Sequence, residues 1–227
     1  MRALGTGQAL GYLAVAALGL GIAFLGRPAW VQIAIGIAIA AIVALAWDIL
    51  SRTGQVSLGS AAFFGLGAYA TALLDPLLGT LAAWIGAVVA CAGVAALLGL
   101  LTLRLRRMYF AIATLGFTLS LQVTVLIFAD WTGGAGGIAP PVVAGGDPRW
   151  QLVLITALLL GAAAISDLLL SQRFRPAFFM IRTNPDLAAA SGVPVVRSKV
   201  LAFMVSGVLA GVAGGCYGGL YGYVVPG

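Results

Sequence analysis

The chain contains seven long stretches in which nearly every residue is apolar. They cover roughly residues 9–25, 30–50, 56–74, 80–103, 108–129, 151–170 and 199–225. About 20 apolar residues are enough to cross the hydrocarbon core of a bilayer as a helix. Only 8% of the residues are charged and 62% are hydrophobic, so the chain has too few charges to cover a water-facing surface. The alternating segments of an outer-membrane barrel are also missing. The sequence therefore predicts an all-α, polytopic membrane protein with about seven spans.

Positive charge is divided unequally between alternate loops. Seven spans place ten basic residues on one side of the membrane: Arg2, Arg52, Arg104, Arg106, Arg107, Arg173, Arg175, Arg182, Arg197 and Lys199. The other side receives only Arg27 and Arg149. Because basic loops stay in the cytoplasm, we expect a cytoplasmic N-terminus and a last span that ends outside.

The composition excludes several kinds of chemistry. The chain has no His and no Glu, so it has neither a Ser–His pair nor an HExxH zinc helix. The single lysine, Lys199, follows Ser198 instead of Gly, which excludes a Walker A loop. We therefore expect no enzymatic activity, no metal site and no cofactor in this chain. The net positive charge of the chain is explained by basic cytoplasmic loops, as is usual in membrane proteins. We therefore expect no nucleic acid partner.

The third span begins with polar residues and glycines, and its apolar part is short for a straight crossing. A broken helix is tolerated at membrane depth only where protein or a cavity lines it, and transport pathways lie in such places. The expected pathway has hydrogen-bonding residues and apolar walls, namely Gln55, Ser57, Ser60, Phe63, Phe64 and Tyr69. The alternative is a tightly packed helix in which Ser and Gly only allow close approach.

Glycines at every fourth position mark the last span. Gly207, Gly211, Gly215 and Gly219 lie along one helix face, and such a ridge allows another helix to approach closely. We therefore assign these four residues to helix packing. Asp48 and Asp167 lie close to the inner ends of their spans, where we expect helix-end salt bridges with Arg52 and Arg173.

Two loops are longer than simple turns. We expect the outer one, residues 130–149, to be flexible. The inner one, residues 171–198, carries an amphipathic segment over 173–192 whose last part has Asp186 near its start and Gly192 at its end. Such a helix suits docking of a cytoplasmic partner, and the alternative is a helix that lies on lipid headgroups.

Several ordered motifs resemble one family. They are GQVSLGSAAF at 54–63, GLGAY at 65–69, YFAIATLGF at 109–117, TGGAGG at 132–137, AAASG at 188–192 and KVLAFMVSGVLAG at 199–211. Together they resemble the permease subunits of branched-chain amino acid ABC importers, the LivM type. The motif YFAIATLGF adds Thr114 to the expected pathway. The chain departs from the family at Ser60, where His is usual, and at Thr183 and Ala190, where acidic residues are usual.

The resemblance implies a single transmembrane permease domain over residues 1–227, and we expect it to be C-terminally incomplete relative to the family. It also implies partners: a second permease subunit, cytoplasmic ABC ATPases, a periplasmic or extracellular solute-binding protein, and the lipid of a bacterial plasma membrane. Residues 171–198 become the ATPase coupling loop, with contacts expected at Arg182, Asp186, Ala188, Ala189 and Gly192. The alternative function is a secondary transporter driven by an ion gradient, which would need an acidic or ion site in mid-membrane.

The charge distribution yields a test of orientation. A topology reporter fused after Gly137 is expected to lie outside the cell, and one fused after Asn184 inside, because ten basic residues lie on the side of Asn184 and two on the side of Gly137. Activity of a periplasm-dependent and a cytoplasm-dependent reporter measures this. The reverse pattern would overturn the count of spans.

Overall fold

A computed structural model describes residues 6–102, 105, 107–140, 142–169 and 174–226. Within these residues seven helices are long and apolar enough to cross a membrane, which confirms the predicted number of spans. They are α1 (Thr6–Leu25), α2 (Pro28–Ser51), α3 (Ser60–Leu78), α4 (Thr80–Thr102), α5 (Arg107–Ile127), α7 (Pro148–Leu169) and α10 (Val195–Tyr221). The shorter elements are α6 (Ala129–Thr132), η1 (Gly134–Gly136), η2 (Val143–Gly146), α8 (Arg175–Thr183) and α9 (Pro185–Ala190).

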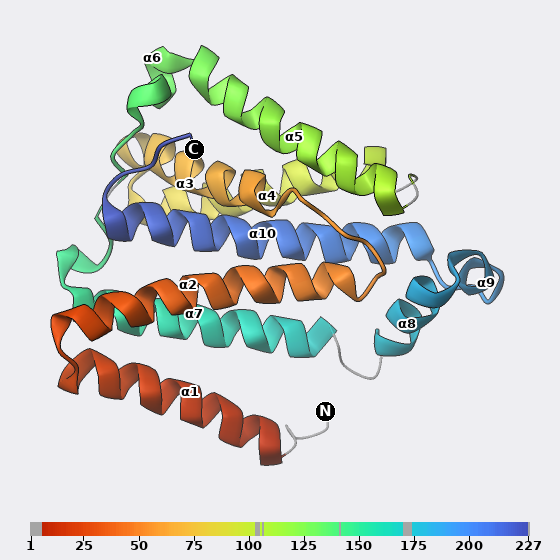
Figure 1. The fold of residues 1–227 in the computed structure, drawn as a ribbon, viewed down its shortest axis with the longest axis horizontal. Coiled ribbons are helices and arrows are strands. Elements are labelled where there is room, and N and C mark those ends of the chain that lie inside the picture. The colour runs from red at the N-terminus through yellow and green to blue at the C-terminus, as the bar shows by residue number, and fades with distance from the viewer. Residues whose placement is uncertain (1–5, 103–104, 106, 141, 170–173, 227) are drawn as a thin grey trace.

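The long helices lie side by side around α10, which runs through the middle of the bundle (Figure 1). Helices α3 and α4 pack on one side of α10 and α2 on another, while α7 packs on α2 and α1 packs on α7. Helix α5 lies obliquely at the opposite edge from α1 (Figure 1). The short helices α8 and α9 lie at the end of the bundle where α2 ends and α10 begins, and α6 lies at the other end (Figure 1).

Proline and glycine set the limits of several helices. Helices α2 and α7 begin at Pro28 and Pro148, where the fixed φ of proline suits the first turn and its missing N–H is not needed. Asp147 caps α7, since its carboxylate accepts a hydrogen bond from the backbone N–H of Arg149 at 2.9 Å. Helix α10 ends at Gly222, whose φ of 68° is a left-handed conformation that glycine adopts without strain.

The glycine ridge of α10 faces α3 and α4. A Cβ on Gly207 would lie 3.1 Å from the Cβ of Ala95 on α4, and a Cβ on Gly211 would overlap the Sγ of Cys91. A Cβ on Gly215 would lie 3.1 Å from the Cγ2 of Thr71 on α3. Gly219 is also buried.

The closest backbone contact joins α3 to α10, at glycines that the ridge analysis did not single out. A Cβ on Gly67 would overlap the backbone of Gly211, and a Cβ on Gly214 would overlap the carbonyl of Phe64. The two helix backbones touch because neither glycine has a side chain. Dispersion contacts at such a crossing hold membrane helices together where the lipid supplies no hydrophobic driving force.

The outer loop is folded, contrary to the expectation of flexibility. The hydroxyl of Thr132 donates to the carbonyl of Val125 at 2.6 Å, and α6 leads directly into η1. Beyond α10 the chain returns to this loop, where Ile138 and Val224 exchange two backbone hydrogen bonds of 3.0 Å. Gly137 has no room for a side chain because the carbonyl of Val224 lies against it. The end of the TGGAGG motif therefore packs closely against the segment that follows α10.

The ridge predicts a sharp size limit at Gly211. Replacing Gly211 by Leu is expected to destabilise the protein or its assembly by at least about 1–3 kcal/mol, because the added side chain overlaps Cys91 and forces α10 away from α4. Thermal stability in detergent and yield of monodisperse protein measure the effect.

Gly93 on α4 provides the matched control, since it is exposed and a Cβ there would have no heavy atom within 4 Å. Gly93→Leu is expected to behave like the wild type. Equal stability of both variants would show that the α10–α4 contact tolerates a large side chain.

Candidate functional site

The polar segment between α2 and α3 is not helical. The third span was expected to begin at residue 56, but α3 begins at Ser60. After α2 the chain turns at Gly54, whose φ is 78°, and then runs back along the bundle before α3 starts (Figure 1). This left-handed turn is strained for residues with a side chain, which explains the glycine. We call residues 53–59 the entry segment.

Side chains of α5 replace the missing helical hydrogen bonds of the entry segment. The hydroxyl of Thr114 accepts a bond from the backbone N–H of Leu58 at 3.0 Å, and the hydroxyl of Thr118 donates to the Leu58 carbonyl at 3.3 Å. Within the segment, Ser57 Oγ accepts from the backbone N–H of Gly59 at 3.0 Å. Non-helical backbone is stable at membrane depth only when its polar groups are satisfied in this way.

Gln55 has hydrogen-bonding capacity that the described residues do not use. Its side chain is 4% exposed, and Thr53 Oγ1 lies 3.5 Å from its Oε1. Its Nε2 atom is buried and has no partner among the described residues. A buried donor without a partner costs free energy and is typical of functional positions or of places that hold water or a ligand. The hydroxyl of Tyr69 is also buried and has no hydrogen-bond partner among the described residues.

Of the residues expected to form apolar walls, Phe63 and Tyr69 are buried and Phe64 is half-buried. Phe63 is 2% exposed and packs edge-to-face on Phe203 of α10, so it belongs to the core in this conformation. Phe64 is half-buried, and its ring lies 5.5 Å from the ring of Tyr217 on α10. Ser60 is half-buried at the first turn of α3. The sequence alone does not single out Tyr217 and Thr118. Their contacts with Phe64 and Leu58 arise only when the helices pack together.

The inner loop contains two helices where one amphipathic helix was expected. They meet at Asn184 and Pro185, since Pro185 cannot continue the hydrogen bonding of α8. Asn184 is the N-cap of α9, and its Oδ1 accepts from the backbone N–H groups of Asp186 and Leu187 at 3.0 and 3.1 Å. Asp186 lies in the first turn of α9, as its expected place near the helix start requires. Residues 171–173 of the expected loop lie outside the described residues.

Most of the expected coupling residues are exposed at this end of the bundle: Arg182, Asp186, Ala189 and Gly192. Ala188 is fully buried and holds α9 against the rest of the chain. Arg182 also packs on the entry segment, because a Cβ on Gly54 would lie only 3.1 Å from its Cα and 3.2 Å from its Cγ. Helix α8 and the entry segment are therefore in direct contact.

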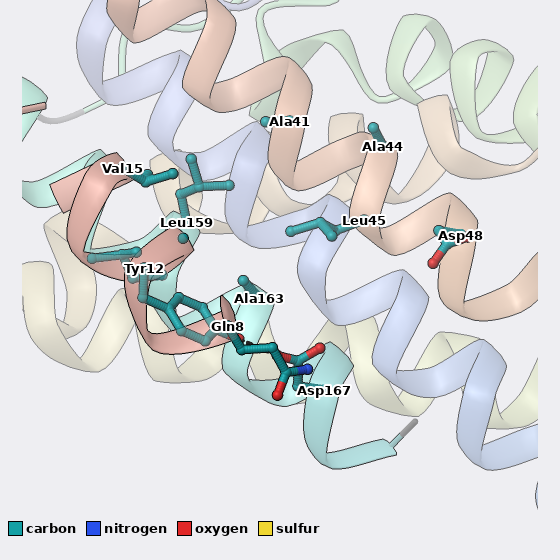
Figure 2. A pocket seen from close by; sticks show the side chains of 12 residues that line it. Gln8, Tyr12, Val15, Ala41, Ala44, Leu45, Asp48, Leu159, Ala163 and Asp167 are labelled. Atoms are coloured by element: carbon teal, nitrogen blue, oxygen red, sulfur yellow. Dashed lines mark hydrogen bonds between the residues drawn. The ribbon is translucent and has the colours of Figure 1, made fainter. Parts of the chain in front are cut away.

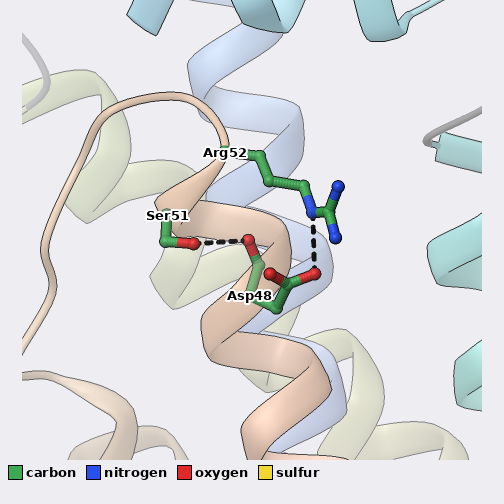
Figure 3. Close-up of polar contacts among 3 residues, drawn as sticks. All are labelled: Asp48, Ser51 and Arg52. Atoms are coloured by element: carbon green, nitrogen blue, oxygen red, sulfur yellow. Dashed lines mark hydrogen bonds and ion pairs between the residues drawn. The ribbon is translucent and has the colours of Figure 1, made fainter.

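The two acids at the inner ends of spans have different partners. Arg52 Nε donates to Asp48 Oδ2 at 2.7 Å, which is the expected helix-end ion pair (Figure 3). Asp167 accepts a 2.5 Å bond from the hydroxyl of Tyr12, which ties α1 to α7, while its expected partner Arg173 lies outside the described residues. Both acids line an open, largely apolar groove of about 670 Å³ between α1, α2 and α7 (Figure 2).

Comparison with known proteins places the chain in a family. A family model described as the branched-chain amino acid transport system permease component matches residues 29–227. The chain belongs to this family. The match begins at α2 and includes the entry segment, the outer loop and the α8–α9 pair. The resemblance to LivM-type permeases is therefore confirmed.

Two curated relatives share part of the permease sequence. The chain is 40% identical over 96 residues to the high-affinity branched-chain amino acid transport system permease protein LivM of Salmonella typhimurium. It is 38% identical over 96 residues to LivM of Escherichia coli. These alignments cover 40% of this chain and 22% of each relative, so the matched region is a small part of their length. No solved structure matches the chain significantly.

The contact between Thr114 and the entry segment generates a test. Thr114→Val keeps the shape of the side chain but leaves the N–H of Leu58 without an acceptor, at a cost of about 1–3 kcal/mol. We expect lower thermal stability and greater accessibility of a cysteine introduced at Leu58. Thr114→Ser keeps the hydroxyl and is expected to retain most of the stability. If Val and Ser variants were equally stable, the hydrogen bond would not hold the segment.

Proposed function

We propose that this chain is the permease subunit of an ATP-driven ABC importer that moves branched-chain amino acids, or related small amino acids and amides, across a bacterial plasma membrane. Membership in the permease family supports a transport role, and the printed names of both LivM relatives support this solute class. The expected partners are a second permease, two cytoplasmic ATPases and a solute-binding protein outside the cytoplasm. ATP is hydrolysed by the ATPase partners.

One observation carries the proposal: the contact between α8 and the entry segment at Arg182 and Gly54. A permease driven by an external ATPase needs a cytoplasmic surface that the ATPase can push and a physical connection from it to the membrane interior. Helices α8 and α9 provide such a surface at one end of the bundle (Figure 1). The entry segment connects it to α5 through Thr114 and Thr118.

In this mechanism the chain performs no chemical step. Docking and closure of the ATPases move α8 and α9, and the contact at Gly54 passes this movement to the entry segment. That segment is held by a few side-chain hydrogen bonds instead of a continuous helical ladder, so it can exchange partners at a lower cost than a helix. Such a two-state element switches the pathway between inward-facing and outward-facing forms.

The proposed pathway runs beside the start of α3, at the interface with the second permease. Gln55 supplies a buried amide donor without a partner among the described residues, and Ser57 and Ser60 supply hydroxyl groups nearby in sequence. Phe64 and Tyr69 supply apolar walls in this proposal, and Phe63 supports them from the core. Thr114 positions the entry segment. Specificity among solutes is expected to depend largely on the binding protein.

Substitution of Ala189 tests the coupling surface. Ala189→Glu adds bulk and charge at an exposed position of α9, so it is expected to weaken copurification with the ATPases or cause futile ATP hydrolysis. Loss of a well-packed contact typically costs about 2 kcal/mol or more, roughly 30-fold in affinity. Copurification from membranes and ATPase activity of the complex measure both effects. Gly192 is a poorer position, because its φ of 80° would strain any side chain.

Ala139→Glu, an exposed change at the opposite end of the bundle, is the matched control and is expected to copurify normally. ATPase binding that is indifferent to Ala189→Glu and to other changes between Arg182 and Gly192 would remove the coupling assignment. The secondary-transporter alternative would then be tested by uptake in the presence of an uncoupler. Uptake that requires ATP and survives the uncoupler supports the importer.

A further inference from the structure

A cavity of about 430 Å³ lies between the end of α2 and α8. Three arginines line it, Arg52 from α2 and Arg175 and Arg182 from α8, and none of its described lining residues is acidic. Pro176, Phe178 and Phe179 complete the lining. The volume falls within the usual range of small-ligand sites, about 300–1,000 Å³.

The seven-residue spacing of two arginines on α8 explains why they line the same cavity. Arg175 and Arg182 are seven residues apart, so they lie on the same helix face, and Phe178 and Phe179 lie between them on that face. Phe178 and Ile181 are each 2% exposed and anchor α8 to the bundle. The two arginines are therefore presented by a helix that packs on the rest of the bundle through Phe178 and Ile181.

Arg52 completes the cavity from the other side. It directly follows the last residue of α2, and its Nε atom donates to Asp48. The ion pair with Asp48 is made by the Nε atom of its guanidinium group (Figure 3). Both side chains of this ion pair are substantially exposed, at 44% and 41%, so the pair does not bury the charge. A planar guanidinium that uses one edge for a carboxylate can present the other edge to a phosphate.

The depth of the cavity points to a lipid ligand. Arg52 ends a membrane span, which places the cavity at the level of the headgroups, and the positive charge distribution assigns this end to the cytoplasm. Phe179 is 65% exposed beside the arginines. An exposed aromatic ring next to cations is typical of the membrane interface, where it contacts acyl chains while the cations contact phosphates.

We propose that Arg52, Arg175 and Arg182 bind the phosphate of an anionic phospholipid from the cytoplasmic leaflet, with Phe179 against the first part of its acyl chain. Lipid binding at this site does not require the proposed transport function, although Arg182 belongs to both the cavity and the proposed coupling contact. Acidic residues of an ATPase are a less suitable ligand, because the surface assigned to the ATPase is α9, whose residues are exposed apart from Ala188 and include no aromatic residue.

The test compares lipids that differ only in their headgroups. Protein purified in neutral detergent is exposed to phosphatidylglycerol or phosphatidylcholine with identical oleoyl chains, and bound lipid is counted by native mass spectrometry. We expect preferential binding of phosphatidylglycerol to the wild type. Arg175→Gln is expected to weaken it roughly fivefold, the effect of one interfacial arginine worth about 1 kcal/mol. Arg175→Lys keeps the charge and is expected to recover part of the binding.

Arg197→Gln is the matched control, since Arg197 is exposed at the same end of the bundle and does not line the cavity. It is expected to bind phosphatidylglycerol like the wild type, which would also show that general surface charge is not responsible. Equal binding by the wild type, Arg175→Gln and Arg52→Gln would overturn the proposal. Displacement of the lipid by millimolar inorganic phosphate would instead identify free phosphate as the ligand. Weaker ATPase copurification by Arg175→Gln with unchanged lipid binding would assign the cavity to the ATPase.

Discussion

The crossing of α3 and α10 is the contact on which the rest of the bundle depends. Gly67 of α3 lies against the backbone of Gly211, and Gly214 of α10 lies against the carbonyl of Phe64, so the two backbones touch. In a membrane, helices gain little from burying apolar surface because lipid is equally apolar. Close approach and dispersion between backbones must therefore supply the association energy. A single methyl group at this crossing would move α3, and with it the entry segment that precedes it.

The entry segment is stable because side chains of α5 make hydrogen bonds to its backbone, in place of those that a helix would make. Thr114 and Thr118 bond the N–H and carbonyl of Leu58, so the non-helical backbone does not leave polar groups in hydrocarbon. This arrangement depends on few bonds, and α8 touches it directly at Gly54. We therefore propose this segment as the conformational switch, with the buried Gln55 amide as a hydrogen-bond donor to a polar solute.

The end of the bundle that carries α8 and α9 combines two surfaces. One is the exposed face of α9, which we assign to an ATPase, and the other is the arginine-lined cavity, which we assign to a lipid phosphate. Arg182 contributes to both regions, since it lines the cavity and packs on Gly54. A lipid bound there would hold α8 at a defined depth while α9 remains available to a partner. The lipid composition of the membrane and the movement of the ATPases would then both act on α8.

The number of spans and their composition followed from the sequence alone, because a bilayer requires about 20 apolar residues per crossing and each stretch satisfies this by itself. The resemblance to the permease family also came from ordered motifs. What only the tertiary structure decided was which residues meet. The spacing of Gly207, Gly211 and Gly215 marks one face, but that Gly67 lies on Gly211 and that Gly214 lies on Phe64 depends on where α3 crosses α10. The bond from Leu58 to Thr114, the burial of Ala188 and the convergence of Arg52 with Arg175 likewise join residues far apart in the chain or on different helices. Local patterns specify a helix and its faces, whereas contacts between helices depend on packing that no single segment encodes.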